Sequence, residues 1–228
     1  MPTGKLSDPS AKEPSKRSSD LFIVDNSDEQ WKAARYLHDW CDIAKSMDIA
    51  TGYFEIGALL ALDGQWQKLE NIRILMGDEV SLRTRDAFAK ALQGLGQKLD
   101  DSIEAEKEKN DFLSGVPAIV AAMQSGQIQC RVYKDRKFHA KAYITHAKLD
   151  VVGPVALVGS SNFTYPGLTD NVELNVRIRH DVEELQEWYE NYWDQAEEVT
   201  PEILKIIERH AREVTPFEVY MKALFEFF

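Results

Sequence analysis

The segment FHAKAYITHAKLDVVGPVALVGSSNFTYPGLTDNVELNV, from Phe138 to Val176, is the part of this chain from which the rest is best interpreted. Its first eight residues, 138–145, alternate small or apolar with polar side chains and predict a β-strand. Residues two apart on a strand point to the same face, so His139 and Lys141 share one face. An imidazole beside an ammonium group suits the chemistry of a phosphate ester, because one attacks phosphorus while the other neutralises its oxygens.

Two more predicted strands follow within the same segment. Val155 to Val158 is apolar on both faces, as in a central strand, and runs directly into Gly159-Ser160-Ser161-Asn162. Residues 171–179 alternate again, and Glu173 is the one acid among their polar positions. The ordered set His-x-Lys, Gly-Ser-x-Asn and strand acid resembles the signature of the phospholipase D superfamily. One position departs from it: His146 stands where that family usually has Asp.

The resemblance implies a role for each matching residue. His139 would be the nucleophile and form a phosphohistidine, while Glu173 would orient its imidazole. Lys141 and Asn162 would hold the non-bridging phosphate oxygens, with Ser160 as a further donor. The leaving oxygen needs a second histidine, but the chain has a single motif, so the resemblance implies a homodimer that pairs two copies of His139. No metal ion or other cofactor is implied.

The charge of the chain is uneven. A net charge of −11 argues against broad nucleic-acid binding. Basic residues nevertheless surround the motif, and Lys134, Arg136 and Lys137 are candidates for holding a polyanionic substrate. The alternative is that these side chains form a solvated strand edge. Tyr53, in the sequence IATGYF, is a further substrate-binding candidate because turns after the early strands line the active site in proteins that this chain resembles.

The remaining patterns predict an α/β fold: a phospholipase D-like mixed sheet with helices on both faces and a C-terminal helical extension. Residues 1–20 are rich in Ser, Pro and Lys and predict a disordered leader. Residues 21–198 would form the catalytic domain, and 199–228 C-terminal helices that lead to a further domain in a parent protein. The expected elements are strands at 21–24, 48–54, 71–76 and 127–133, and helices at 29–41, 55–62, 81–108, 111–125, 181–196 and 201–214, with a last one from 217. Phe54, Arg73 and Gly77 are secondary candidates for the rim of the site, although Phe54 is at least as well explained as a core aromatic at a strand end.

The composition also bears on location. No apolar run approaches the roughly 18–20 residues that span a bilayer, and the N-terminus lacks the apolar segment of a secretory signal. Only two cysteines are present, Cys41 and Cys130, which fits a reducing compartment. We therefore expect a cytoplasmic protein with no membrane partner.

The leading functional hypothesis is a metal-independent nuclease, with DNA as the expected nucleic acid. The arrangement of motifs is also similar to nuclease-like domains at the N-terminus of SWI/SNF-type helicases and in restriction or phage-defence systems, which implies a helicase domain or subunit as a partner. The alternative from the binding class is a DNA-binding or dimerisation module with little or no catalysis. Phospholipid hydrolysis is the third hypothesis, and the absence of an amphipathic membrane face speaks against it.

Overall fold

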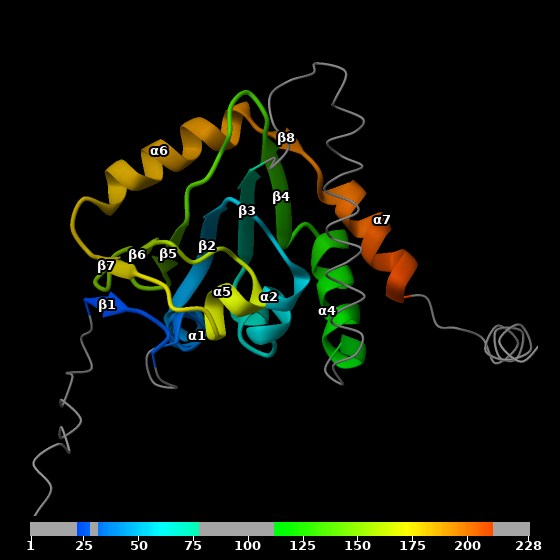
Figure 1. Ribbon diagram of the computed structural model, residues 1–228, viewed down its shortest axis with the longest axis horizontal. Helices are drawn as coiled ribbons and strands as arrows, with labels where there is room; N and C mark the ends of the chain where they lie inside the picture. Colours follow the sequence, from blue (N-terminus) through cyan, green and yellow to red (C-terminus); the bar gives the residue numbers. More distant parts are fainter. Residues whose placement is uncertain (1–21, 28–31, 78–111, 212–228) are drawn as a thin grey trace, which may run out of the picture.

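The computed structural model describes residues 22–27, 32–77 and 112–211. The predicted leader, the predicted helix at 81–108 and the predicted last helix from 217 lie outside the described residues. Within the described residues the fold is an α/β sandwich built on one mixed sheet (Figure 1).

The sheet has eight strands in the order β1-β7-β6-β5-β2-β3-β4-β8. Strands β2, β3 and β4 are parallel to one another, and every other neighbouring pair is antiparallel. Seven of these strands correspond to predicted strands, whereas the short β8 was not predicted. Their bounds are β1 (Ile23–Val24), β2 (Ala44–Thr51), β3 (Asn71–Gly77), β4 (Ile128–Tyr133), β5 (Ala142–Ala147), β6 (Val155–Gly159), β7 (Asn175–Ile178) and β8 (Glu197–Glu198).

Helices cover both faces of the sheet, as the sequence predicted. Among the described helices α6 lies alone across one face, and the others gather on the opposite face (Figure 1). The short helices α5 and η1 were not predicted. The bounds are α1 (Ala33–Ile43), α2 (Ile56–Ala61), the 3₁₀ helix η1 (Trp66–Lys68), α4 (Phe112–Gln124), α5 (Tyr165–Thr169), α6 (Val182–Gln195) and α7 (Thr200–Ala211).

Each face of the sheet has its own apolar core. On the face with several helices, Met47 and Ile49 of β2 pack with residues of α1, α2, α4 and α7. On the α6 face, Ala50 of β2 packs with Tyr189 and Trp193. Strand β2 is therefore covered on both sides, and its residues from Met47 to Thr51 are all buried. Helix α7 packs against α4 and β4, so the first C-terminal helix contributes to the core layer.

The topology brings the whole motif to one edge of the sheet. The parallel strands β2 and β3 end at this edge, and the antiparallel strand β5 begins there, with Ala142 opposite Ala50. Strand β6 ends at the same edge, where Gly159 faces Asn175 at the start of β7. The residues before β5, after β6 and before β7 consequently lie close together, although His139 and Glu173 are 34 positions apart in the sequence.

Several predicted strand boundaries are wrong. The strand expected at 48–54 is β2, Ala44–Thr51, and the one expected at 171–179 is β7, Asn175–Ile178, so Glu173 lies just before a strand and not on it. The strand expected at 138–145 begins only at Ala142, so His139 and Lys141 lie in an extended segment just before β5. The pairing of β5 with β2 stops at Ala142 opposite Ala50, one residue before β2 ends at Thr51. Gly77 accommodates it: a Cβ atom at Gly77 would lie only 2.2 Å from the Phe138 carbonyl oxygen.

Candidate active site

Three residues of the predicted site converge on Gly52, directly after β2. A Cβ atom placed on Gly52 would lie 3.0 Å from His139 Cδ2, 3.2 Å from Lys141 Nζ and 3.3 Å from Asn162 Oδ1. The imidazole, the ammonium and the amide therefore surround one small space at the edge of the sheet. The absence of a side chain at Gly52 keeps that space open, which suits the close approach of a ligand.

The lysine of the motif lies against the histidine. Lys141 Nζ is 2.9 Å from His139 Nδ1 and 3.0 Å from Nε2, and it donates a hydrogen bond to the His139 carbonyl oxygen at 3.0 Å. Lys141 is only 7% exposed, whereas His139 is exposed. A cation held in a partly dry position interacts more strongly with an incoming anion than one in open solvent. The arrangement places a fixed positive charge beside an accessible imidazole.

The amide of Asn162 is oriented by the end of β2. Its Oδ1 accepts a hydrogen bond from the Tyr53 backbone N–H at 3.2 Å, and Thr51 Oγ1 lies 3.5 Å from the same oxygen. The Thr51 hydroxyl also accepts a hydrogen bond from the Phe163 N–H at 2.9 Å, which joins the two segments. With Oδ1 held in this way, the amide nitrogen is the end of Asn162 that can donate to a phosphate oxygen.

Ser160 and Glu173 form a second group beside the first. Ser160 Oγ donates to Glu173 Oε2 and accepts a hydrogen bond from the Leu174 N–H at 2.9 Å. Asn171 Nδ2 is 3.4 Å from Glu173 Oε1. In the structure the Ser160 proton is thus directed at Glu173. That Ser160 donates to a substrate and that Glu173 orients the imidazole both stay predictions.

A buried hydrogen-bonded group fixes the loop that carries Asn162. Tyr143 donates to the Ser161 carbonyl oxygen at 2.9 Å, and Asn175 Nδ2 donates to Ser161 Oγ at 2.9 Å and to the Val24 carbonyl oxygen at 3.1 Å. Burial, and then the charge of nearby Glu173, raise the pKa of Tyr143, so its hydroxyl stays a donor. The loop is therefore anchored to β5, β7 and β1 at once.

The basic residues near the motif divide into two kinds. Lys134 Nζ pairs with Glu197 of β8 at 2.5 Å, so part of its charge is already balanced. Arg136 and Lys137 are exposed and line a pocket together with His139. That any of the three cations binds a substrate stays a prediction.

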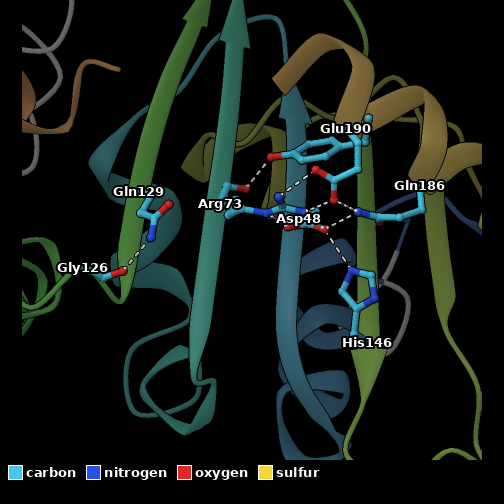
Figure 2. Close-up of polar contacts among 8 residues, drawn as sticks. Asp48, Arg73, Gly126, Gln129, His146, Gln186 and Glu190 are labelled. Carbon is cyan, nitrogen blue, oxygen red and sulfur yellow. Dashed lines mark hydrogen bonds and ion pairs between the residues drawn. The ribbon is translucent and has the colours of Figure 1, made fainter. Parts of the chain in front are cut away.

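His146 takes part in a different structure on the α6 face of the sheet (Figure 2). Its Nε2 lies 2.9 Å from Oδ2 of Asp48, a β2 residue that is 2% exposed. Arg73 donates to both Asp48 oxygens, at 2.6 and 2.7 Å, and to both oxygens of Glu190 on α6, while Gln186 donates to Asp48 at 2.9 Å. We call these five residues the Asp48 network. It joins β2, β3 and β5 to α6.

The Asp48 network explains two features of the sequence. The acid that the family pattern places at position 146 is replaced by His146, and here a carboxylate from the adjacent strand meets that side chain. Arg73 was predicted as a residue of the active-site rim, and this is wrong, because its guanidinium lies within the network, 5.2 Å from each of the Tyr189 and Trp193 ring centres. Burial opposes ionisation of Asp48, but the hydrogen bonds from His146 and Arg73 outweigh it and hold the pKa of Asp48 below its ordinary value.

Sequence reasoning missed Gly52 and Thr51 as site residues. The only available signal was the change from apolar residues to Thr51-Gly52 where the strand ends. Small residues at that point allow another group to approach the backbone closely, but they do not indicate which group it is. Tyr53, which was predicted, supplies its backbone N–H to Asn162, and a contact between its ring and a substrate stays a prediction.

Two further observations concern the described residues as a whole. No three His, Cys, Asp or Glu side chains within 22–27, 32–77 and 112–211 gather as they would around a metal ion. None of the helices in those ranges is long and apolar enough to cross a membrane. Cys41 and Cys130 are both buried free thiols.

The chain matches a protein-family model and is similar to several solved structures. A family model described as "Cardiolipin synthase, PLD-like domain" matches residues 43–195, more than half of the chain. Among solved structures the chain is similar to Nuc, a phospholipase D family member from Salmonella typhimurium, with 22% identity over 72% of this chain and 89% of that one and a TM-score of 0.41. NucT from Helicobacter pylori is similar at 12% identity over the same shares, with a TM-score of 0.43. No curated protein sequence matches the chain.

Proposed function

This chain belongs to the phospholipase D superfamily, and we propose that it is a nuclease that hydrolyses phosphodiesters of nucleic acid, DNA in the first place, without a metal ion. The observation that carries the proposal is the convergence of His139, Lys141 and Asn162 around Gly52. Attack at phosphorus requires a nucleophile, which the exposed imidazole supplies. Stabilisation of the phosphate oxygens requires a cation and a hydrogen-bond donor, which the largely buried ammonium and the oriented amide supply.

The proposed reaction has two steps. In the first, an imidazole nitrogen of His139 attacks phosphorus and the bond to the leaving oxygen breaks, while a second histidine gives that oxygen a proton. In the second, water loses a proton to the same second histidine and attacks the phosphohistidine, which releases the product and restores His139. Lys141 and the Asn162 amide would bind the non-bridging oxygens in both steps.

The second histidine would come from another copy of the chain. Val172 and Leu174, which flank Glu173, are 92% and 58% exposed, and Phe22, whose carbonyl oxygen accepts a hydrogen bond from the Arg177 N–H of β7, is 64% exposed. Apolar side chains grouped beside a catalytic segment are typical of a surface that another protein covers. A two-fold homodimer would bring one His139 to each side of a single phosphate. The two imidazoles would then titrate as a coupled pair.

The nuclease proposal is tested by incubating the purified protein with single- and double-stranded DNA and RNA in EDTA. Cleavage that survives EDTA and disappears in His139→Asn supports it, whereas cleavage that needs added metal contradicts it. Binding of DNA with no cleavage by the wild type would favour the alternative, a DNA-binding or dimerisation module. The matched control is His180→Asn, because His180 is an exposed histidine that lies beyond the end of β7.

The dimeric site has its own test. Leu174→Asp should give a monomer by analytical ultracentrifugation and lose cleavage together with dimerisation. A monomeric variant that cleaves as fast as the wild type would contradict the shared site. We also propose, from the resemblance alone, that the domain acts in the cytoplasm alongside a helicase or a restriction-defence enzyme; copurification from cells tests this.

A further inference from the structure

A pocket lined by aromatic residues opens directly beside His139. It has a volume of about 280 Å³, and its lining residues are Tyr133, Arg136, Lys137, Phe138, His139, Ala140, Trp188 and Tyr192. They come from the end of β4, from the segment before β5 and from α6. Pockets for whole small-molecule ligands are usually about 300–1,000 Å³, so this one fits a single planar ring system.

The rings form one connected cluster. Phe138 stacks on Trp188 with ring centres 6.0 Å apart and planes 19° from parallel. Tyr192 meets Phe138 at 5.7 Å, Tyr133 at 5.1 Å and Trp188 at 5.1 Å. Phe138 and Tyr133 are buried, while Trp188 and Tyr192 are half-buried and keep part of their surface open. The pocket therefore has a fixed aromatic floor and two aromatic walls that a ligand can contact.

The charges around the pocket select the ligand. Arg136 and Lys137 are exposed cations on its lining, so it favours an aromatic group that is joined to an anion. A quaternary ammonium head group, which aromatic cages also bind, would meet two like charges here. A nucleobase attached to a phosphate chain satisfies both requirements, because the base stacks on the rings while the phosphates lie along the cations.

We propose that this pocket binds one unpaired nucleobase of the nucleic-acid substrate, next to the phosphate that His139 attacks. The proposal rests on the proposed nuclease function and specifies its substrate. A base inside a duplex presents its edge and not its face, so it cannot enter unless it is unstacked. Single-stranded segments, overhangs and flaps are therefore the preferred substrates. Trp188 is a binding residue for the base and takes no part in the chemistry.

The test compares two polymers with the same phosphates: oligothymidylate, and an abasic deoxyribose-phosphate chain of equal length. Binding is measured by fluorescence anisotropy in the His139→Asn background, so that no substrate is consumed. The thymidylate should bind roughly 10- to 100-fold more tightly, the range that stacking of one base provides. Trp188→Leu should remove most of that ratio, and Trp188→Phe should restore most of it. Tyr36→Leu, a half-buried aromatic on α1, is the matched control and should leave the ratio unchanged.

The outcomes separate this proposal from the nuclease proposal. If Trp188→Leu keeps the full preference for bases, or if Trp188→Phe loses as much as Trp188→Leu, the base pocket is refuted even when cleavage is observed. If the wild type cleaves nothing but the ratio follows Trp188, the pocket stands and the nuclease proposal fails. Trp188-dependent binding to phosphatidylglycerol vesicles that exceeds binding to oligothymidylate would overturn the proposal in favour of a lipid.

Discussion

Replacing Asp48 with alanine removes the carboxylate to which Arg73, His146 and Gln186 all donate. Asp48 is 2% exposed, so the variant leaves these donors facing a space that solvent hardly reaches. Removing one partner of a buried ion pair costs about 3–5 kcal/mol, because the other charge stays buried. Arg73 is 21% exposed and keeps both hydrogen bonds to Glu190, which places the expected loss at the lower end, about 3 kcal/mol.

The assay is thermal unfolding followed by circular dichroism, with urea unfolding to obtain the free energy. For a domain of this size 1 kcal/mol corresponds to about 2–4 °C, so Tm should fall by about 6–12 °C. The matched control is Asp42→Ala, which removes an exposed carboxylate paired with Lys68 at 2.5 Å. Exposed pairs contribute little, so the control should unfold near the wild-type temperature. Equal shifts in the two variants would refute the claim that the Asp48 network holds α6 to the sheet.

Three other perturbations follow from the same contacts. The pKa values of Asp48 and Glu190 are lowered in the folded state. The stability that these carboxylates contribute is therefore present above the ordinary carboxyl pKa and is lost as pH falls through the folded pKa values. When Tm is measured as a function of decreasing pH, it should decline more steeply in the wild type than in Asp48→Asn. Gly52→Ala should leave Tm close to the wild-type value but reduce cleavage by roughly 100-fold, since the new methyl displaces His139; unchanged turnover would contradict the assignment of the site. Gly77→Ala should cost at least about 1–3 kcal/mol in urea unfolding, because its Cβ would collide with the Phe138 carbonyl, and a neutral result would show that the segment shifts freely.

The sequence predicted the parts of the fold that depend on local pattern. Seven strands and the long covering helix α6 were expected from alternation and periodicity, and the ordered motif indicated that His139, Lys141 and Asn162 belong together. The structure brings these three around one point because the antiparallel strands β5 and β6 start and end where β2 ends. The order of the motif therefore predicted which residues lie together in space, which periodicity alone does not predict.

The features that were missed depend on contacts between distant segments. His146 meets Asp48 across 98 positions, and Lys134 meets Glu197 across 63. Nothing local in the sequence distinguishes a lysine that is paired with a distant acid from one that is open to a substrate. The length of β5 was also overestimated at its N-terminal end, because the end of the neighbouring strand β2 determines where β5 begins. Gly52 was overlooked for a related reason, since a missing side chain matters only through what surrounds it.

The proposed mechanism requires a covalent bond between His139 and the substrate phosphate. During turnover in EDTA, a sample is quenched in alkali, digested and analysed by mass spectrometry. We expect the peptide that contains His139 to carry a nucleotide bound through its phosphate to the imidazole. This adduct should be labile in acid, present at early times and absent in His139→Asn. Turnover at the wild-type rate with no such adduct, or with the adduct on another residue, would contradict the proposed mechanism.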